Sequence, residues 1–191
     1  MGTPTLGPHL LLIGLRASGK STLGRALARA LGGVAFVDLD DRTRAALGAP
    51  SVRAAFEHAG ESGFRAAEAA ELRRALAEPS QVLALGGGTP TAPGAEALIA
   101  EARREGRAFV VFLDLPVEVL AERLRAHEGD RPSLTGRGVV AEIGDLALAR
   151  RPRYAALADL RLFEPLDEAS LVSIITSQVG SASSADADAK P

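Results

Sequence analysis

Residues 14–22 read Gly14-Leu15-Arg16-Ala17-Ser18-Gly19-Lys20-Ser21-Thr22. They match the G-x-x-x-x-G-K-[ST] pattern, in which the backbone N–H groups of a glycine-rich loop surround the phosphates of a nucleotide. A short apolar run of strand type over residues 9–13 precedes the loop, and apolar residues recur at helical spacing over residues 21–31. The sequence therefore predicts a strand, a phosphate-binding loop and a helix in succession.

Each part of this loop has a predicted task. Gly14 and Gly19 allow tight turns, and the helix that follows directs the positive end of its dipole at the same anion. Lys20, one of only two lysines in the chain, supplies a compact positive charge to the β- and γ-phosphates, and the Ser21 hydroxyl is expected to ligate Mg²⁺. The loop residues predicted to bind the nucleotide are Gly14, Ala17, Ser18, Gly19, Lys20, Ser21 and Thr22.

The composition excludes several classes of protein. The 24 acidic and 22 basic residues leave a net charge of −2 over 191 residues, which gives no positive field for nucleic acid. The chain has no cysteine, which excludes disulfides and thiolate metal sites and fits a reducing cytosol. Its start lacks the basic segment of a signal peptide, and no apolar run is long enough to span a bilayer. We expect a cytoplasmic monomer without nucleic acid or membrane partners.

Strand and helix patterns alternate along the chain. Strands are predicted at residues 9–13, 34–38, 81–85, 108–113 and 159–163. Helices are predicted at residues 21–31, 43–47, 51–77 with a break near 60–63, 94–104, 116–127, a segment ending at 150, and 167–179. This order favours a three-layer α/β/α fold around a five-stranded parallel sheet, with ligands at the carboxyl ends of the strands. Residues 1–179 are predicted to form one domain and residues 180–191 a disordered tail.

Two of the predicted strands end in residues suited to a site. The second strand runs into Asp38-Leu39-Asp40, whose carboxylates would point the same way if the strand continued through them. The alternatives are a solvated strand end and an aspartate that caps the next helix. The third strand runs into Gly86-Gly87-Gly88, which would expose backbone N–H groups to a ligand, and here the alternative is a flexible turn.

Taken together, the motifs resemble the shikimate kinase family, a small branch of the P-loop proteins similar to nucleoside-monophosphate kinases. The matching segments, in the order found in that family, are Gly14 to Thr22, Phe36-Val37-Asp38-Leu39-Asp40, Gly63-Phe64-Arg65 with Glu68, Leu85-Gly86-Gly87-Gly88, Asp130-Arg131-Pro132-Ser133-Leu134 and Arg150-Arg151-Pro152-Arg153-Tyr154. The resemblance covers about residues 8–178. It implies a mobile lid at about residues 128–140. It also implies transfer of the γ-phosphate of ATP, with Mg²⁺, to the 3-hydroxyl of shikimate, a step of chorismate and aromatic amino-acid biosynthesis.

The resemblance also implies roles in catalysis. Asp38 corresponds to a carboxylate in the Mg²⁺ shell, together with Ser21. Asp40 corresponds to the residue that binds the ring hydroxyls and acts as a general base. Arg131 corresponds to the lid arginine that closes over the transferring phosphoryl group of ATP. Lys20, Asp40 and Arg131 are therefore the predicted catalytic residues.

Further matched residues are implied to hold the acceptor. Arg65 and Arg150 correspond to the arginines that bind the shikimate carboxylate, and a planar guanidinium suits this task because it can bond both carboxylate oxygens. The run Gly86-Gly87-Gly88 corresponds to the backbone that lines the shikimate pocket, and Glu68 to an acid that orients the pocket arginine. Arg123 is a candidate contact of the adenine base.

Two other functions fit part of the pattern. A gluconate-type kinase of the same fold would share the phosphate loop, but the pair Arg65 and Arg150 with Asp40 suits a rigid ring acid better. A ligand-sensing regulator that binds aromatic compounds would share the pocket. Such a sensor has no need of Lys20 or Arg131, so the sequence favours a kinase.

Overall fold

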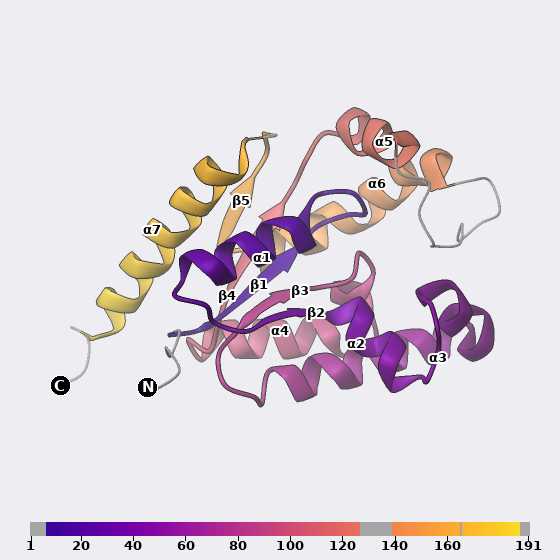
Figure 1. Cartoon of the computed structure of the whole chain (residues 1–191), viewed down its shortest axis with the longest axis horizontal. Coiled ribbons are helices and arrows are strands. Elements are labelled where there is room, and N and C mark those ends of the chain that lie inside the picture. The colour runs from indigo at the N-terminus through magenta and orange to yellow at the C-terminus, as the bar shows by residue number, and fades with distance from the viewer. Residues whose placement is uncertain (1–6, 127–138, 165, 188–191) are drawn as a thin grey trace.

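The computed structural model describes residues 7–126, 139–164 and 166–187 of the chain (Figure 1). Its strands lie within the ranges predicted from the sequence. They are β1 (His9–Ile13), β2 (Phe36–Asp38), β3 (Val82–Ala84), β4 (Ala108–Leu113) and β5 (Leu160–Leu162).

The strands form one parallel sheet in the order β2-β3-β1-β4-β5 (Figure 1). The central strand is β1, and all of its side chains are buried. The predicted five-stranded parallel fold is therefore confirmed. Because the strands are parallel, the segments that follow β1, β2, β3 and β4 all leave the sheet at the same edge.

The helices occupy the connections between the strands. They are α1 (Lys20–Ala30), α2 (Leu39–Ala46), α3 (Val52–Ala75), α4 (Ala95–Arg104), α5 (Val117–Ala126), α6 (Val139–Leu157) and α7 (Glu168–Ala187), with a 3₁₀ turn, η1, at Thr89–Thr91. Gly60, with φ 67° and ψ 173°, interrupts α3 where the sequence predicted a break. Within the described ranges, no helix has both the length and the apolar character needed to cross a membrane.

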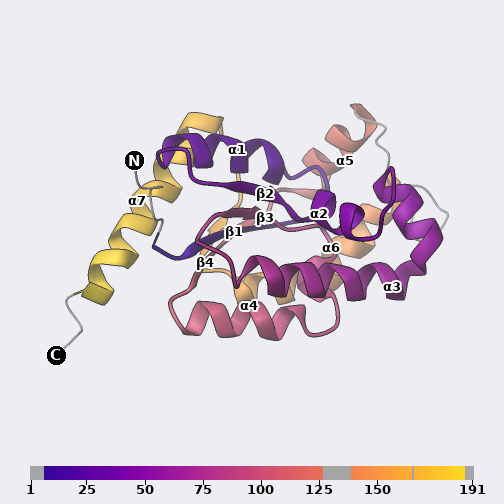
Figure 2. The ribbon, with the colours of Figure 1, turned by 60° about the horizontal axis from the view of Figure 1, so that its bottom comes forward.

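Helices cover both faces of the sheet, as Figure 2 shows for α1 on one side and α3 and α4 on the other. Leu10 and Leu12 of β1 pack with side chains of α1 and α7. Leu11 and Ile13 point to the opposite face and pack with side chains of α2 to α6. This alternation follows the two-residue period of a strand and confirms the three-layer arrangement.

Strand β2 ends at Asp38 and does not continue through Asp40. Asp38 is the N-cap of α2, and its carboxylate accepts a hydrogen bond from the backbone N–H of Asp40 at 3.1 Å. The cap starts a helix at Leu39, because it satisfies an N–H group that the first helical turn leaves without a partner. The strand does not continue through Asp40, so the condition for two carboxylates on one strand face is not met, and the alternative in which an aspartate caps the next helix is correct.

Two helices extend beyond their predicted ends. Helix α6 passes Arg150 and an internal proline, Pro152, to reach Leu157, because Tyr154 beyond the proline is fully buried and anchors the last turns in the core. Helix α7 passes Val179 and ends at Ala187, so this part of the predicted disordered tail is helical. Residues 180–187 prolong a helix that is already nucleated, so each added residue can form a backbone hydrogen bond without a new nucleation step.

We expect Gly24 of α1 to be intolerant of a side chain. A Cβ atom there would overlap the ring of Phe36 and lie 3.3 Å from Leu12 Cδ1. Gly24→Ala should therefore lower the free energy of unfolding by about 1–3 kcal/mol, measured by urea denaturation. Gly144→Ala in α6 is the matched control, because nothing lies within 4 Å of a Cβ atom there.

The control variant should gain about 0.5–1 kcal/mol, since alanine is the better residue inside a helix. Equal stabilities of the two variants would contradict close packing of α1 on β2.

Candidate active site

The phosphate loop connects β1 to α1 in a conformation that needs glycine at its first position. Gly14 has φ 152°, and a Cβ atom there would lie 2.8 Å from both Leu113 O and Ser18 Oγ. Ala17 and Gly19 also have positive φ, 60° and 93°. The loop therefore curls tightly between the end of β1 and the first turn of α1, with Gly19 as the N-cap of that helix.

Lys20 holds its ammonium group across this loop. Its Nζ donates to the carbonyl oxygens of Gly14 and Leu15, both at 2.9 Å, and lies 3.4 Å from Ser18 Oγ. No side chain caps the N-terminus of α1, so the partial positive charge of the helix end lies beside the ammonium group. The loop thus gathers positive charge where an anionic phosphate would bind.

Ser21 and Asp38, the residues predicted to face Mg²⁺, lie together. Ser21 Oγ donates to Asp38 Oδ2 at 2.5 Å, which joins the start of α1 to the end of β2. Oxygen ligands of this kind suit Mg²⁺. In the described part of the chain, no group of three or more His, Cys, Asp or Glu side chains is arranged to hold a metal ion by itself. A Mg²⁺ ion here would therefore complete its shell with phosphate and water oxygens, as this ion commonly does.

A small pocket of about 50 Å³, with charged and apolar side chains in its lining, lies on the Gly87 side of the phosphate loop. Its lining residues come from the loop, α2, α3, the segment after β3, and α6, and they are Arg16, Asp40, Val52, Phe56, Phe64, Arg65, Glu68, Gly87, Gly88, Leu146 and Arg150. The structure thus brings together the predicted acceptor residues Asp40, Arg65 and Arg150 with the glycine run. We call this the acceptor pocket.

Arg65 is held in the acceptor pocket by a buried partner. Its guanidinium donates to Glu68 Oε2 at 2.5 Å, and Glu68, only 1% exposed, also accepts from the Thr89 hydroxyl at 2.7 Å. The Arg65 guanidinium carbon lies 5.6 Å and 5.9 Å from the ring centroids of Phe56 and Phe64. Two aromatic rings and a paired carboxylate thus hold the Arg65 guanidinium in the lining of the acceptor pocket.

The glycine run after β3 is closely packed rather than a flexible turn. A Cβ atom at Gly86 would overlap an oxygen of Asp40, and one at Gly88 would overlap the Arg65 guanidinium. The carbonyl oxygen of Gly87 accepts hydrogen bonds from the guanidinium of Arg150 and, at 2.6 Å, from the Tyr154 hydroxyl. Glycine is required here because functional side chains of two helices approach the backbone.

Tyr154 has a structural part in this arrangement. Its side chain is fully buried, and its ring meets that of Phe112 edge-on with centroids 5.5 Å apart. Burial raises the pKa of the Tyr154 hydroxyl to about 12. The hydroxyl therefore stays protonated at neutral pH and serves as a donor to Gly87.

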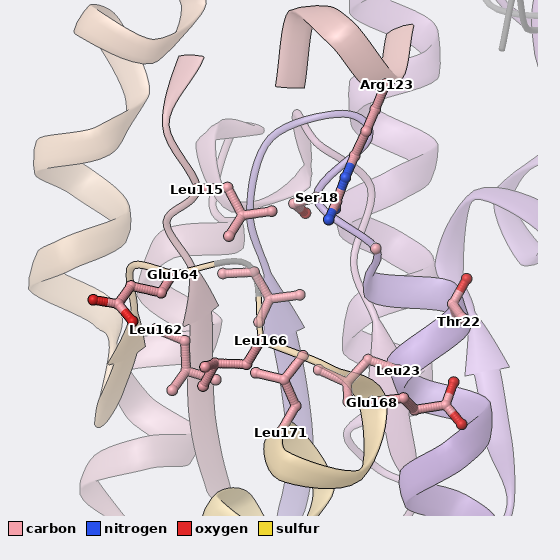
Figure 3. A pocket seen from close by; sticks show the side chains of 12 residues that line it. Ser18, Thr22, Leu23, Leu115, Arg123, Leu162, Glu164, Leu166, Glu168 and Leu171 are labelled. Carbon is pink, nitrogen blue, oxygen red and sulfur yellow. The ribbon is translucent and has the colours of Figure 1, made fainter. Parts of the chain in front are cut away.

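A second pocket, of about 290 Å³, lies on the other side of the phosphate loop (Figure 3). Ser18, Gly19 and Thr22 form its phosphate-loop side. Its apolar wall consists of Leu23, Leu113, Leu115, Leu162, Leu166 and Leu171. Arg123 of α5 points into it in Figure 3 and donates to Ala17 O at 3.2 Å. An apolar pocket that opens beside the phosphate loop suits a nucleotide base. We call it the nucleotide pocket.

Several site residues were not predicted, and one predicted residue is not placed. Phe56, Val52 and Leu146 form apolar walls of the acceptor pocket, and no motif distinguishes them in the sequence from ordinary core residues. Arg16 of the phosphate loop also lines the acceptor pocket. Arg131 and the predicted lid before α6 lie outside the described residues.

Comparisons with known proteins agree on one family. The family model described as shikimate kinase matches residues 16–179. A shikimate kinase of Stenotrophomonas maltophilia (strain K279a) is 41% identical over 155 residues, which are 81% of this chain and 82% of that protein. The structure described as shikimate kinase from Acinetobacter baumannii in complex with shikimate has a TM-score of 0.81 at 31% identity, covering 91% of this chain and 93% of its own. A gluconokinase from Sinorhizobium meliloti 1021, which covers 97% of this chain and 99% of its own, shares the fold alone, with a TM-score of 0.58 at 16% identity.

The contacts of Arg65 predict unequal effects of its two acidic neighbours on stability. Glu68→Gln removes a buried charge that pairs with Arg65, and we expect a loss of about 1–3 kcal/mol in the free energy of unfolding. Glu61, whose side chain is 60% exposed and lies 3.8 Å from Arg65, is the matched control. Glu61→Gln should change stability by less than about 0.5 kcal/mol. Similar losses in both variants, measured by urea denaturation, would contradict this assignment.

Proposed function

The chain belongs to the shikimate kinase family, and we propose that it transfers the γ-phosphoryl group of ATP to the 3-hydroxyl of shikimate with the residues gathered at this site. The products are shikimate 3-phosphate and ADP. The observation that carries the proposal is the position of two pockets on either side of the phosphate loop, one apolar and one lined by Asp40, Arg65 and Arg150.

ATP is assigned to the phosphate loop and the nucleotide pocket. The loop N–H groups and Lys20 surround the phosphates, and the leucine walls take the base. Ser21 and Asp38 would hold Mg²⁺, whose charge neutralises phosphate oxygens when it is bound. The Gly14 and Leu15 carbonyls hold the Lys20 ammonium group beside the loop N–H groups.

Shikimate is assigned to the acceptor pocket. Its carboxylate is placed against the guanidinium groups of Arg65 and Arg150, which are fixed by Glu68 and by the Gly87 carbonyl respectively. Fixed guanidinium groups set the orientation of the ring as well as its charge pairing. One hydroxyl is thereby directed at the γ-phosphate, which lowers the entropic part of the barrier.

Asp40 is assigned the proton of the attacking hydroxyl. The residue is 7% exposed and lines the acceptor pocket. As the oxygen of shikimate bonds to phosphorus and the bond to the ADP oxygen breaks, the hydroxyl proton passes to the Asp40 carboxylate. Arg131, carried by the segment before α6, is assigned to the charge on the transferring phosphoryl group.

The pocket supports a ring acid over an open-chain sugar acid. Phe56 and Phe64 form an apolar wall, with ring centroids 5.0 Å apart, and the pocket is small. The apolar CH and CH₂ groups of the shikimate ring fit this wall, whereas gluconate, with a hydroxyl on every carbon after its carboxylate, would place hydroxyl groups against it without partners. The cytoplasmic location and the monomeric state stay predictions.

A coupled ADP-release assay with MgATP tests the proposal on three acceptors, shikimate, quinate and gluconate. We expect ADP release that depends on shikimate. Asp40→Asn should lower kcat by about 10²- to 10⁴-fold, because the proton loses its acceptor. Arg150→Ala should raise the KM for shikimate, and Lys20→Met should abolish turnover with the fold intact.

Circular dichroism of each variant controls for folding. Activity on gluconate alone would contradict the proposal. So would intact nucleotide binding without activity on any of the acceptors.

A further inference from the structure

We propose that Asp114 is a positioning residue for the acceptor pocket, because it fixes Arg151 and thereby the direction of Arg150. The inference rests on the proposed function, in which Arg150 binds the shikimate carboxylate. Asp114 follows β4 and lines neither of the two pockets. Asp114 contacts no substrate in the proposed function and acts only through Arg151 and Arg150.

Asp114 is a buried carboxylate shared by two arginines. Its side chain is 7% exposed, its Oδ1 lies 2.8 Å from Arg151 Nε, and its Oδ2 accepts from Arg161 at 2.6 Å. The backbone N–H of Asp114 donates to Leu162 O at 2.8 Å, which fixes the residue to the end of β5. A buried charge needs such partners, and here they tie α6, β4 and β5 to one point.

Arg151 has a second contact on the same segment. It donates to Leu115 O at 2.5 Å, so its guanidinium bonds to the backbone of one residue and pairs with the carboxylate of the residue before it. One hydrogen bond and one ion pair, without hydrogen-bond geometry between Nε and Oδ1, thus hold the planar guanidinium in place. A lysine, with a single ammonium group, could reproduce only part of this arrangement.

Arg150 and Arg151 hold α6 from two sides. Consecutive helical residues project about 100° apart, so one guanidinium reaches Gly87 after β3 and the other reaches Asp114 after β4. The helix cannot rotate without breaking one of the contacts. The next residue is Pro152, which lacks the N–H group of an ordinary helical turn, so side-chain contacts matter more at this point.

Loss of the Asp114–Arg151 pair should therefore act on shikimate more than on ATP. The nucleotide pocket contains no residue of α6 and meets the pair only through Leu115 and Leu162, which bond to Arg151 and Asp114 by their backbone carbonyls. The acceptor pocket takes Leu146 and Arg150 from α6. A small rotation of α6 would move the Arg150 guanidinium away from the carboxylate it binds, and misplacement of this kind is costly in a positioned site.

The test compares Arg151→Gln with a matched variant, Arg103→Gln. Arg103 also contacts one carboxylate, that of Asp159, and one backbone carbonyl, Ala156 O at 3.2 Å. Ala156 lies in the last turn of α6, so this variant controls for a contact with the same helix that is away from both pockets. In the ADP-release assay, Arg151→Gln should raise the KM for shikimate on the order of tenfold, with the KM for ATP changed less than about twofold. Arg103→Gln should leave both KM values unchanged.

Two further variants keep the result interpretable. Arg151→Lys should recover part of the lost affinity, and Asp114→Asn should reproduce the effect of Arg151→Gln, with folding checked by thermal unfolding. Equal KM values for shikimate in Arg151→Gln, Arg103→Gln and the unmodified protein would overturn the inference while leaving the proposed function intact. If Arg150→Ala itself left that KM unchanged, the assignment of Arg150 would fail first, and the inference with it.

Discussion

The carbonyl oxygen of Gly87 accepts two hydrogen bonds, from the Arg150 guanidinium and the Tyr154 hydroxyl, and the acceptor side of the site depends on them. They join α6 to the end of β3. The flanking glycines let Asp40 and Arg65 approach the same backbone, since a Cβ atom on either glycine would overlap one of them. Side chains from α2, α3 and α6 are thus positioned against a single tripeptide.

The parallel sheet explains why this tripeptide faces the phosphate loop. β3 pairs directly with β1, so the segments that follow the two strands leave the sheet side by side. β2 lies on the far side of β3 and delivers Asp38 to Ser21, and β4 lies on the far side of β1 and delivers Asp114. Charged groups from separate parts of the chain therefore meet at one edge, where Asp38, Glu68 and Asp114 each have a hydrogen-bonded or ionic partner.

Much of this could be predicted, because the decisive signals are local in the sequence. The phosphate loop carries its own spacing, and strand and helix periods give the sheet. The sequence left open whether the second strand ends at Asp38, because Asp38-Leu39-Asp40 is compatible both with a continuing strand and with a helix cap. The hydrogen bond from the Asp40 N–H group to the Asp38 carboxylate decides for the cap. Phe56 could not be predicted, because nothing in its local sequence distinguishes it from an ordinary core residue. The Asp114–Arg151 pair could not be predicted either, because its two residues are far apart in the sequence.

We infer that the contacts of α6 with Gly87 hold the acceptor pocket in a binding conformation. Calorimetric titration with shikimate alone, on the unmodified protein and on Tyr154→Phe, tests it most directly. We expect Tyr154→Phe, which loses one hydrogen bond to Gly87, to bind shikimate about fivefold more weakly and to bind ATP unchanged. Equal shikimate affinity in the two proteins, with the fold intact, would contradict it.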